Sequence, residues 1–268
     1  MFNLFYDLIE RPLKEGHILQ NRYQIIQFIG KGGYGIAYKA EDQLTGQFVV
    51  VKQLRKRKRK SRNGQLEREA KILTIFSHSS IPSFIDFFQE DNKIFLIMEH
   101  MNGKNVEDLI FLYGHKYNEE NSFRFLLKVL QVVKYLHDNE IIHRDLRLPN
   151  ILIDDQHISI IDFGLAAWIH EKDLDHLSSM PMEKRLLREV SFQSDFYALG
   201  HFVLFLLYST YETFSKQENS WEEELVIKDG SRRVIRKLLN LETGYENVTE
   251  IINDVEKELL DFKNELVF

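Results

Sequence analysis

The sequence predicts an α+β fold, in which a strand-rich N-terminal part precedes a helix-rich C-terminal part. Residues 21–54 are rich in β-branched and aromatic residues and carry glycines at positions 30, 32, 33 and 35, which favours strands joined by a glycine turn. Later segments place apolar residues at the three- and four-residue spacing of helices. With 268 residues, 44% of them apolar, the chain can form one large domain or two small lobes.

The N-terminal part is expected to hold a small sheet and one main helix. A third strand covers Phe48–Leu54, and two shorter strands fit Ser83–Phe88 and Lys93–Glu99. Between them, the apolar residues of Gln65–Phe76 recur every three or four positions, which predicts a helix. The segment Met101–Gly103 is expected to be a hinge between the lobes.

The C-terminal part is expected to be mostly helical. The predicted helices are Val106–Tyr113, Asn121–Asn139, Ser194–Tyr208, Glu222–Ile227, Ser231–Leu241 and Val248–Phe262. Short apolar runs at Ile141–Ile153 and Ile158–Ile161 flank polar loops, and residues 168–193 lack a period and are expected to be a loop. The expected division is a helical extension over residues 1–20, one lobe over 21–100 and a second over 101–268.

Composition excludes several function classes. The chain contains no cysteine, so disulfides, thiolate metal sites and cysteine nucleophiles are absent. A formal charge of −6, from 35 basic and 41 acidic residues, argues against wholesale nucleic-acid binding. Seven of those basic residues lie in Arg55–Arg62. This run is either a solvated loop or a docking site for an anionic partner, which would be nucleic acid, anionic lipid or an acidic protein.

Targeting and membrane-spanning segments are not expected. The start, Met1–Glu10, lacks a basic region and carries two acidic residues, so it resembles a short amphipathic helix rather than a signal peptide. The most apolar run, Tyr197–Tyr208, has twelve residues, whereas a membrane-spanning helix needs about 20. We therefore expect a cytoplasmic protein, and the sequence leaves its oligomeric state undetermined.

The glycines of Gly30–Gly35 lie between two expected strands. A dinucleotide-binding loop would be followed by a helix, but Ile36–Ala40 resembles a strand. A glycine-rich β-turn lets backbone N–H groups approach phosphates closely. An ordinary glycine hairpin is the alternative.

A lysine and a glutamate follow this turn. Lys52 ends the next expected strand, and Glu69 lies on the first expected helix. A buried pair of these side chains could hold the ammonium group against a phosphate. The alternative for Glu69 is a solvated position on the helix surface.

Two further motifs supply carboxylates and an amide. Asp145 and Asn150 belong to His143–Asn150, and Asp162 opens Asp162–Gly164 after a strand-like run. Carboxylate and amide oxygens suit Mg²⁺, which prefers oxygen ligands and substrate phosphates. One further carboxylate can accept the proton of an attacking hydroxyl.

In order and spacing these motifs match the protein-kinase signature set. From about Tyr23 to Phe262 the sequence resembles the catalytic domain of a bacterial serine/threonine protein kinase of the eukaryotic-like (Hanks) type. The resemblance implies a two-lobed fold, with a small antiparallel sheet lobe bearing one main helix and a larger helical lobe. It also implies ATP and Mg²⁺, with Mn²⁺ as a substitute, and transfer of the γ-phosphate to serine or threonine hydroxyls of proteins, including autophosphorylation.

The resemblance assigns roles to individual residues. The phosphate-covering loop would consist of Gly30, Gly32, Gly33 and Gly35. The catalytic group would comprise Lys52, Glu69, the base Asp145 and its neighbour Arg147, with Asn150 and Asp162 holding the metal. The adenine pocket would be lined by Ala37, Val50, Met98, Glu99, Met101 and Leu152. Asp195 would anchor the catalytic loop, and a stack between the lobes would contain Leu73, Ile85, His143 and Phe163.

Several positions depart from the family pattern. Ala37 and Val50 exchange the usual valine and alanine of the adenine roof, which roughly conserves their summed volume, so we expect the pocket to close on adenine with Leu152 below the ring. The alternative is an altered nucleotide preference. Arg147 stands where the family carries lysine; it keeps the charge but has a planar fork, so its contact to the γ-phosphate would differ and the choice between serine/threonine and tyrosine stays open. The Ala-Pro-Glu triplet of the substrate platform is missing, and the resemblance implies that Glu183, twelve residues before Asp195, would stand in for its glutamate and that the substrate is unusual. The alternative is a shortened, divergent loop that packs another way. The arginine partner of that glutamate would fall near residue 245, which is a tyrosine, and the platform threonine is also absent.

The loop after Asp162 is expected to be modified. Ser178 and Ser179 are the only hydroxyl-bearing residues between Gly164 and Val190. Arg144 can pair with a phosphate added to this loop. We therefore expect autophosphorylation of one of these serines.

Two alternatives to a protein kinase stay open. The first is a small-molecule phosphotransferase of the same fold, although such enzymes rarely carry an arginine before the catalytic aspartate. The second is a pseudokinase scaffold, against which Lys52, Asp145 and Asp162 argue.

Overall fold

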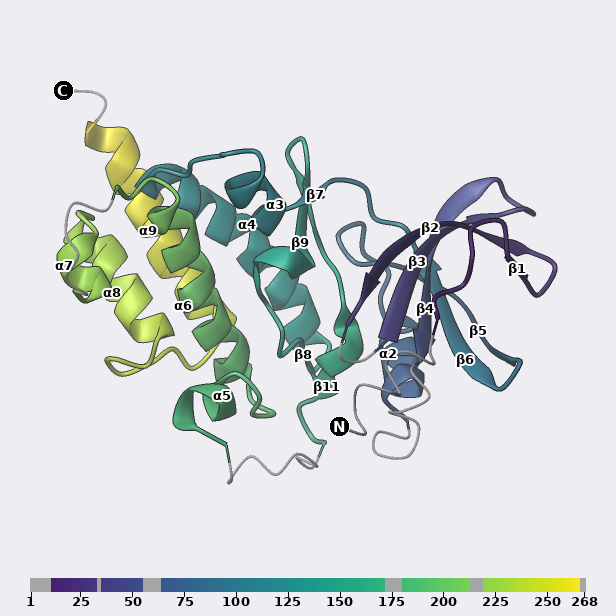
Figure 1. Ribbon diagram of the computed structural model, residues 1–268. Coiled ribbons are helices and arrows are strands. Elements are labelled where there is room, and N and C mark those ends of the chain that lie inside the picture. Colours follow the sequence, from purple (N-terminus) through teal and green to yellow (C-terminus); the bar gives the residue numbers. More distant parts are fainter. Residues whose placement is uncertain (1–10, 33–34, 55–63, 172–179, 213–218, 266–268) are drawn as a thin grey trace, which may run out of the picture. The chain divides into compact units, whose positions relative to one another are not determined.

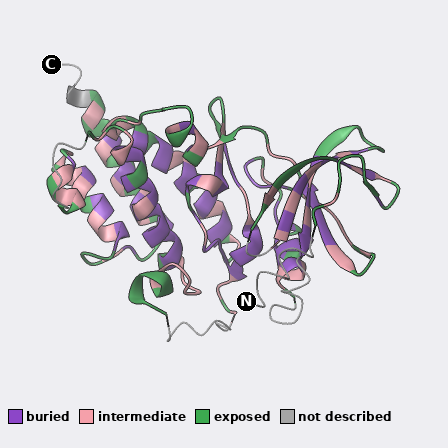
Figure 2. Cartoon of the chain, viewed as in Figure 1, coloured by how far each residue is buried: buried purple, intermediate pink, exposed green. Residues whose placement is uncertain are grey.

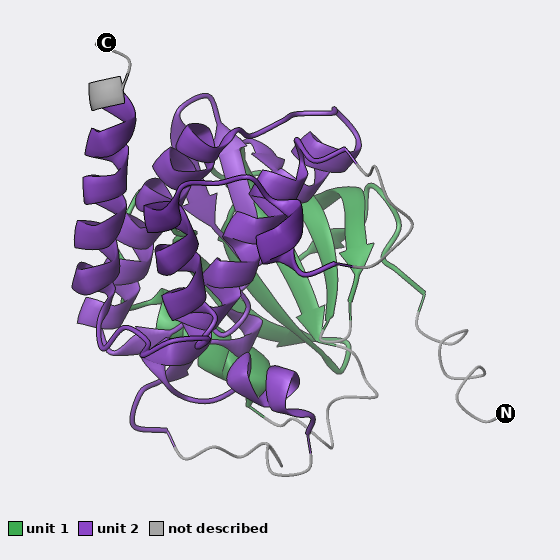
Figure 3. Ribbon diagram, turned by 90° about the vertical axis from the view of Figure 1, so that its left-hand side faces the viewer, with its two compact units in different colours: residues 1–101 green, residues 102–268 purple. Residues whose placement is uncertain are grey.

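The computed structural model describes residues 11–32, 35–54, 64–171, 180–212 and 219–265. The chain divides into two compact units, Met1–Met101 and Asn102–Phe268 (Figure 3). Some sequence predictions fall outside the described residues and stay predictions: those for the start Met1–Glu10, Gly33, the run Arg55–Arg62, Ser178 and Ser179.

The first unit is built on a six-stranded antiparallel sheet with the order β1-β2-β3-β4-β6-β5 (Figure 1). Its strands are β1 (Ile18–Leu19), β2 (Tyr23–Lys31), β3 (Gly35–Asp42), β4 (Gln47–Leu54), β5 (Phe84–Glu90) and β6 (Lys93–Glu99). Its helix α2 (Gln65–Leu73) buries Leu66, Ala70 and Leu73 at the predicted spacing. The helix ends three residues earlier than the sequence predicts.

Alternate residues of the sheet belong to two different surfaces. Ile36 and Tyr38 on β3 and Val51 on β4 are fully buried, and they join a core cluster with Tyr23 and Ile25. Residues one position along each strand point to the opposite face because side chains alternate across a strand. In β3 those residues are partly exposed, as Figure 2 shows by its alternating colours. The register therefore decides which side chains share the more open face.

The predicted helical extension over residues 1–20 is wrong for residues 11–20, the part that the structure describes. Ile18 and Leu19 form β1 and pair with β2, and Leu19 is buried in the sheet core. The N–H of Leu13 donates to the hydroxyl of Tyr38 over 3.0 Å. Pairing with the sheet satisfies these backbone and apolar groups, so a helix is not formed there.

The second unit is mainly helical. Its helices are α3 (Val106–Phe111), α4 (Glu119–Asp138), α5 (Met182–Leu186), α6 (Phe192–Tyr208), α7 (Trp221–Glu224), α8 (Asp229–Leu238) and α9 (Val248–Glu265). The long helix α4 packs against both α6 and α9 (Figure 1). It begins at Asn118, whose side chain accepts a hydrogen bond from the N–H of Asn121 over 2.9 Å. None of the described helices is long and apolar enough to cross a membrane.

The expectation of a loop throughout residues 168–193 is also wrong in part. The short helix α5 lies within this segment and buries none of its side chains. A helix without a buried face needs no apolar stripe, so its sequence shows no helical period.

Short strands place the polar loops of the second unit. They are β7 (Lys104–Asn105), β8 (Ile141–Ile142), β9 (Ile151–Asp154), β10 (His157–Ile160) and β11 (Ala167–Trp168). Strand β9 lies between β10 and β7, while β11 pairs with β8. Two 3-10 turns, Leu148–Asn150 and Phe163–Leu165, connect these strands. The pairing of β8 with β11 brings the segment before His143 next to the segment after Asp162.

Candidate active site

The glycine turn of the first unit has open space beside two of its glycines. The N–H of Gly32 donates to the carbonyl of Gly35 over 2.9 Å, which closes the turn between β2 and β3. A Cβ atom on Gly30 or Gly32 would meet no described atom within 4 Å. At Gly35, by contrast, a Cβ atom would lie 2.9 Å from the carbonyl oxygen of Gln53. Packing therefore explains Gly35, whereas Gly30 and Gly32 leave the backbone open to close approach by a ligand.

Ala37, Val50, Lys52 and Met98 share the open face of the sheet. The register pairs Ala37 with Lys52 and Val50 with Met98, and directly opposed residues of an antiparallel pair point to the same side. Residues 50 and 52 point the same way because side chains alternate. The two exchanged roof residues thus lie on one surface with the predicted lysine.

Lys52 is paired with Glu69. The ammonium Nζ of Lys52 donates to Oε1 of Glu69, and the two side chains are 17% and 3% exposed. Glu69 lies on the buried side of α2 with Leu66 and Ala70. A carboxylate at this depth requires a partner. The alternative of a solvated Glu69 is therefore wrong.

The predicted adenine-contacting residues Glu99 and Met101 lie at the end of the first unit. The carboxylate of Glu99 accepts hydrogen bonds from the N–H of Ser83 over 3.1 Å and from its hydroxyl over 2.8 Å. The N–H of Glu99 donates to the carbonyl of Ser83 over 2.9 Å. Met101 is half-buried. Of the predicted stack residues in this unit, Leu73 is buried, whereas Ile85 lies at a bulge of β5 and packs on the sheet core.

In the second unit, Asp195 fixes the backbone of the loop that carries Asp145. Its Oδ2 accepts hydrogen bonds from the N–H of His143 and from Nε2 of His137, both over 2.9 Å. Its Oδ1 accepts from the N–H of Arg144 over 2.7 Å. Asp195 is 0% exposed. Burial alone would raise the pKa of this carboxyl group, but the hydrogen bond and charge of His137 outweigh burial and lower it.

These bonds stabilise an unusual backbone at Arg144. Its φ is 63°, in the left-handed region that a residue with a side chain rarely adopts. Such a conformation costs about 1–3 kcal/mol and persists only where the surroundings fix it. The Arg144 N–H bond to Asp195 supplies that restraint, so the direction of the chain into Asp145 depends on Asp195.

His143 is a neutral spacer between the loop and Phe163. Its Nδ1 accepts from the N–H of Asp145 over 3.3 Å, so Nε2 carries the proton and donates to the carbonyl of Ile161 over 3.2 Å. Burial lowers the pKa of His143. Its ring packs edge-on against Phe163 with a centroid distance of 4.8 Å. The two stack residues predicted for this unit therefore contact each other.

Asn150 fixes the carboxylate of Asp145. The Asn150 amide Nδ2 donates to both the backbone carbonyl and Oδ2 of Asp145, each over 2.9 Å. Two acceptors identify Nδ2 as the nitrogen of the amide, so the other side-chain atom, Oδ1, is the oxygen. Arg147 Nε lies 3.5 Å from Oδ2 of Asp145, with a side chain that is 64% exposed.

A backbone hydrogen bond joins Ile161, the residue before Asp162, to Asn150. The N–H of Ile161 donates to the carbonyl of Asn150 over 2.9 Å. Asp162 then adopts a left-handed backbone, with φ of 66°, and its Oδ1 accepts from the N–H of Gly164 over 3.4 Å. Leu152, predicted to lie below adenine, is half-buried on β9 opposite Asn105.

The donor set fits a magnesium ion that also binds substrate phosphates. An amide oxygen and a carboxylate are hard oxygen ligands, and Mg²⁺ usually takes one or two carboxylates together with phosphate oxygens. Within the described ranges, no group of three or more His, Asp or Glu side chains could hold a metal alone. Asn150 and Asp162 therefore suit a metal that arrives with a phosphate ligand.

Arg188 is a site residue that the sequence analysis missed. Its Nη1 donates to the carbonyl of Arg144 over 2.8 Å and to Oδ1 of Asp145 over 3.3 Å. In return, Nη2 of Arg144 donates to the carbonyl of Arg188. Arg188 lies 43 residues after Asp145, outside the catalytic motif, so no local spacing could have identified it.

Asp145 lines a cavity of about 450 Å³ in the second unit. Arg147, Arg188 and Glu183 line it as well, together with apolar residues that include Phe111 and Phe205. The predicted stand-in Glu183 therefore shares this cavity with the catalytic loop. Residue 245, where the family arginine is missing, is a buried tyrosine whose hydroxyl donates to Asp254 over 2.9 Å.

Comparison with known proteins agrees with this geometry. The family model of the protein kinase domain matches residues 23–267. The probable serine/threonine-protein kinase YbdM of Bacillus subtilis is 34% identical over 254 residues, which cover 94% of this chain and 95% of that protein. Serine/threonine-protein kinase B of Synechocystis is 29% identical over 89% of this chain but 47% of its own length. Human NUAK family SNF1-like kinase 1 is 34% identical, covering 59% of this chain and 24% of its own.

Proposed function

Because the chain belongs to the protein kinase family, we propose that it transfers the γ-phosphate of ATP, with Mg²⁺, to serine or threonine hydroxyls of proteins. The observation that carries the proposal is the fixed carboxylate of Asp145, which Asn150 holds over 2.9 Å. Two relatives that align with most of this chain are named as serine/threonine-protein kinases, which supports the choice of acceptor.

Asp145 acts on the acceptor hydroxyl. Its carboxylate takes the proton as the hydroxyl oxygen attacks the γ-phosphorus, and the bond to the bridging oxygen of ADP breaks. Asn150 orients one carboxylate oxygen and Arg188 contacts the other, so the base is presented in one geometry. Such positioning is the main contribution of a kinase to phosphoryl transfer.

Residues of the first unit bind the phosphates. Glu69 fixes the ammonium group of Lys52, which contacts the α- and β-phosphates. The space beside Gly30 and Gly32, where no side chain intervenes, lets phosphate oxygens approach the turn closely. Ala37, Val50 and Met98 present apolar surface to the adenine ring from the same face of the sheet.

Asn150 and Asp162 would hold Mg²⁺ through the amide oxygen and the carboxylate. When bound, the ion neutralises negative charge on the phosphate oxygens. The hydrogen bonds of Asn150 to Asp145 couple the metal ligand to the proton acceptor, so a change at Asn150 affects both tasks.

Autophosphorylation of Ser178 or Ser179 belongs to the same proposal. Arg144 is directed at the carbonyl of Arg188, so a phosphate on the loop would have to compete with this contact. Phosphosite mapping after incubation with Mg-ATP tests the modification. An active enzyme that carries no phosphate on either serine would exclude it.

Acceptor specificity is tested with radiolabelled ATP and three acceptor classes. The purified chain is incubated with a serine/threonine-containing protein, a tyrosine-only peptide and a set of aminoglycosides and choline. Label on the protein alone, absent in the Asp145→Asn variant, is the expected result. Label on a small molecule would favour a small-molecule phosphotransferase, and no label on any acceptor would favour a scaffold without catalysis.

A further inference from the structure

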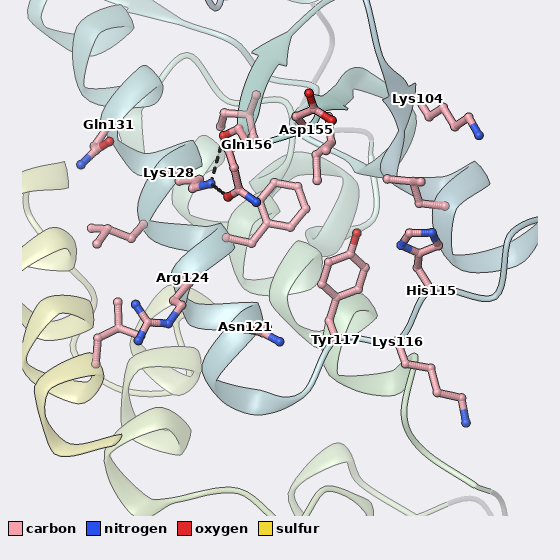
Figure 4. Close-up of a pocket in the computed structure, with 16 residues that line it drawn as sticks. Lys104, His115, Lys116, Tyr117, Asn121, Arg124, Lys128, Gln131, Asp155 and Gln156 are labelled. Carbon is pink, nitrogen blue, oxygen red and sulfur yellow. Dashed lines mark hydrogen bonds between the residues drawn. The ribbon is translucent and has the colours of Figure 1, made fainter. Parts of the chain in front are cut away.

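A second, larger cavity lies on the second unit, apart from the one that contains Asp145. It measures about 840 Å³ and is formed by the segment after α3, the first turns of α4, the β9–β10 hairpin and α9 (Figure 4). None of its lining residues lines the cavity beside Asp145. We call this cavity the basic trough because lysine and arginine side chains line it.

The floor of the basic trough is apolar. Leu109, Phe125, Ile158 and Leu259 line it and are each at most 7% exposed. The ring of Tyr117 tilts against Phe125 with a centroid distance of 5.8 Å. Figure 4 shows Tyr117 pointing into the middle of the trough. This surface can receive aliphatic or aromatic side chains of a ligand.

The rim of the basic trough is cationic. Four basic side chains line it against one acidic side chain, Asp155: they are Lys104, Lys116, Arg124 and Lys128. This excess of positive charge occurs on a chain whose formal net charge is −6. The rim is therefore a local reversal of the overall charge of the protein, which favours an anionic ligand.

Most of these basic side chains do not form ion pairs with acidic side chains among the described residues. Arg124 pairs with Glu120 one helical turn away over 2.5 Å. Lys128 donates to the carbonyl and side-chain oxygen of Gln156, both neutral groups, over 3.0 and 2.8 Å. Lys104 lies over the ring of Tyr113, 3.7 Å from its centroid. Among the described residues, no carboxylate forms an ion pair with Lys104, Lys116 or Lys128.

Hydrogen bonds hold the walls of the basic trough in place. The N–H of His115 donates to the carbonyl of Leu109 over 2.8 Å. The N–H of Tyr117 donates over 2.8 Å to the hydroxyl of Ser209, the residue that directly follows helix α6. A wall that is fixed before binding loses little conformational entropy when a ligand arrives.

We propose that the basic trough binds an extended acidic segment of a partner protein that also carries aliphatic or aromatic side chains. Figure 4 shows Lys104, Lys116 and Lys128 at separate edges of the cavity rather than pointing at one position. A single phosphate needs convergent donors, whereas an extended chain can place several carboxylates along a rim. The apolar floor adds contacts that a bare polyanion cannot use.

The proposal goes beyond the phosphotransfer activity and does not depend on it. Binding is measured directly on the full chain by fluorescence anisotropy, with the labelled decapeptide Glu-Asp-Leu-Glu-Glu-Phe-Asp-Leu-Glu-Glu as probe. This peptide has no hydroxyl group that could be phosphorylated, so it does not report on an acceptor site. The same peptide with every acid replaced by its amide, and a decamer of glutamate, are the comparison probes.

The test variant is the triple substitution Lys104→Gln, Lys116→Gln and Lys128→Gln. Its matched control carries Lys14→Gln, Lys71→Gln and Lys257→Gln, three exposed lysines that do not line the trough. The two variants have the same net charge. Any difference in peptide affinity therefore comes from the location of the charges rather than from their number.

The expected result is binding of the acidic decapeptide that weakens about tenfold or more in the test variant and about twofold or less in the control. The amide peptide should not bind, polyglutamate should bind more weakly, and rising salt should reduce affinity. Hydrogen exchange should slow in residues 113–131 and 153–158 when the peptide is bound.

Four outcomes would overturn the proposal. Equal affinity in the two triple variants would place the anion site elsewhere, and loss of binding on neutralising Arg55–Arg62 instead would assign it to that run. Tighter binding of polyglutamate or of a 20-nucleotide single strand than of the decapeptide would indicate a general polyanion surface. No binding of the decapeptide at about 1 mM, the weak limit of specific recognition, would leave the trough without this function.

Discussion

The anchor role of Asp195 predicts a large effect of a nearly isosteric change, Asp195→Asn. The carboxylate accepts three hydrogen bonds, and two of them come from the backbone of the catalytic loop. An amide keeps one oxygen and replaces the other with a nitrogen that donates. Whichever way the amide turns, at least one N–H donor then faces another donor inside a fully buried site.

The magnitude follows from the bond that is lost. In the less costly orientation, the amide oxygen faces the N–H of His143 and the ring of His137. The hydrogen bond to the N–H of Arg144 is then lost. A hydrogen bond to a charged group contributes about 1.5–3 kcal/mol, and the two remaining bonds become neutral. We expect the free energy of unfolding to fall by about 3 kcal/mol, which corresponds to a decrease in Tm of about 6–12 °C for a chain of this size.

The assay is calorimetric unfolding together with phosphoryl transfer. Asp138→Asn is the matched control because Asp138 pairs with Lys134 on the surface and its side chain is 58% exposed. This control should lower Tm by about 2 °C or less. Release of the left-handed backbone at Arg144 should also reduce kcat in Asp195→Asn at temperatures where the variant is folded. A Tm within about 2 °C of the unaltered protein would refute the anchoring role.

Three other predictions concern the glycine turn, the Arg22–Asp42 pair and Arg188. Gly35→Ala should lower the free energy of unfolding by about 1–3 kcal/mol because its Cβ would press on a carbonyl of β4. Gly32→Ala should leave the free energy of unfolding unchanged and raise only the KM for ATP. Equal losses of Tm in the two variants would contradict this. The pKa of Asp42 is lowered to about 2, chiefly by its hydrogen bond with Arg22. The pair therefore stabilises the fold above pH 4, and that contribution is lost as pH falls from about 4 to 2. Since Arg22 is 30% exposed, Arg22→Gln should cost roughly 1 kcal/mol at pH 7 in urea unfolding, and a cost that grows on acidification would contradict the sign. Arg188→Met should reduce kcat about tenfold without changing the affinity for ATP, and Arg188→Lys should recover part of the lost kcat. An unchanged kcat in Arg188→Met would mean that Arg188 has only a packing role.

The site could be predicted from the sequence where one local motif carries the chemistry. Asp145 and Asn150 are five residues apart in one loop, and a hydrogen bond joins them. The pairing of Lys52 with Glu69 needed the neighbouring motifs, because an isolated glutamate on a helix is more often solvated. Burial of Glu69 beside Leu66 removed that ambiguity.

The remaining features depend on tertiary contacts that no local pattern encodes. Arg188 reaches Asp145 across 43 residues of chain, and its own segment has no helical or strand period. The helix α5 buries no side chain, so its sequence resembles a loop. Ile18 and Leu19 became part of the sheet because β2 offers an unpaired edge, and pairing with an edge leaves little trace in composition.

If Asp145 accepts the proton of the attacking hydroxyl, removing its negative charge should slow phosphoryl transfer without weakening nucleotide binding. The direct test compares kcat for phosphoryl transfer to a protein acceptor in the unaltered chain and in Asp145→Asn, with the Kd for Mg-ATP measured separately by calorimetry. We expect kcat to fall about 10²- to 10⁴-fold, the range for loss of a general base, while the Kd for ATP changes less than about threefold. A variant that retains kcat within about threefold of the unaltered chain would contradict this role of Asp145.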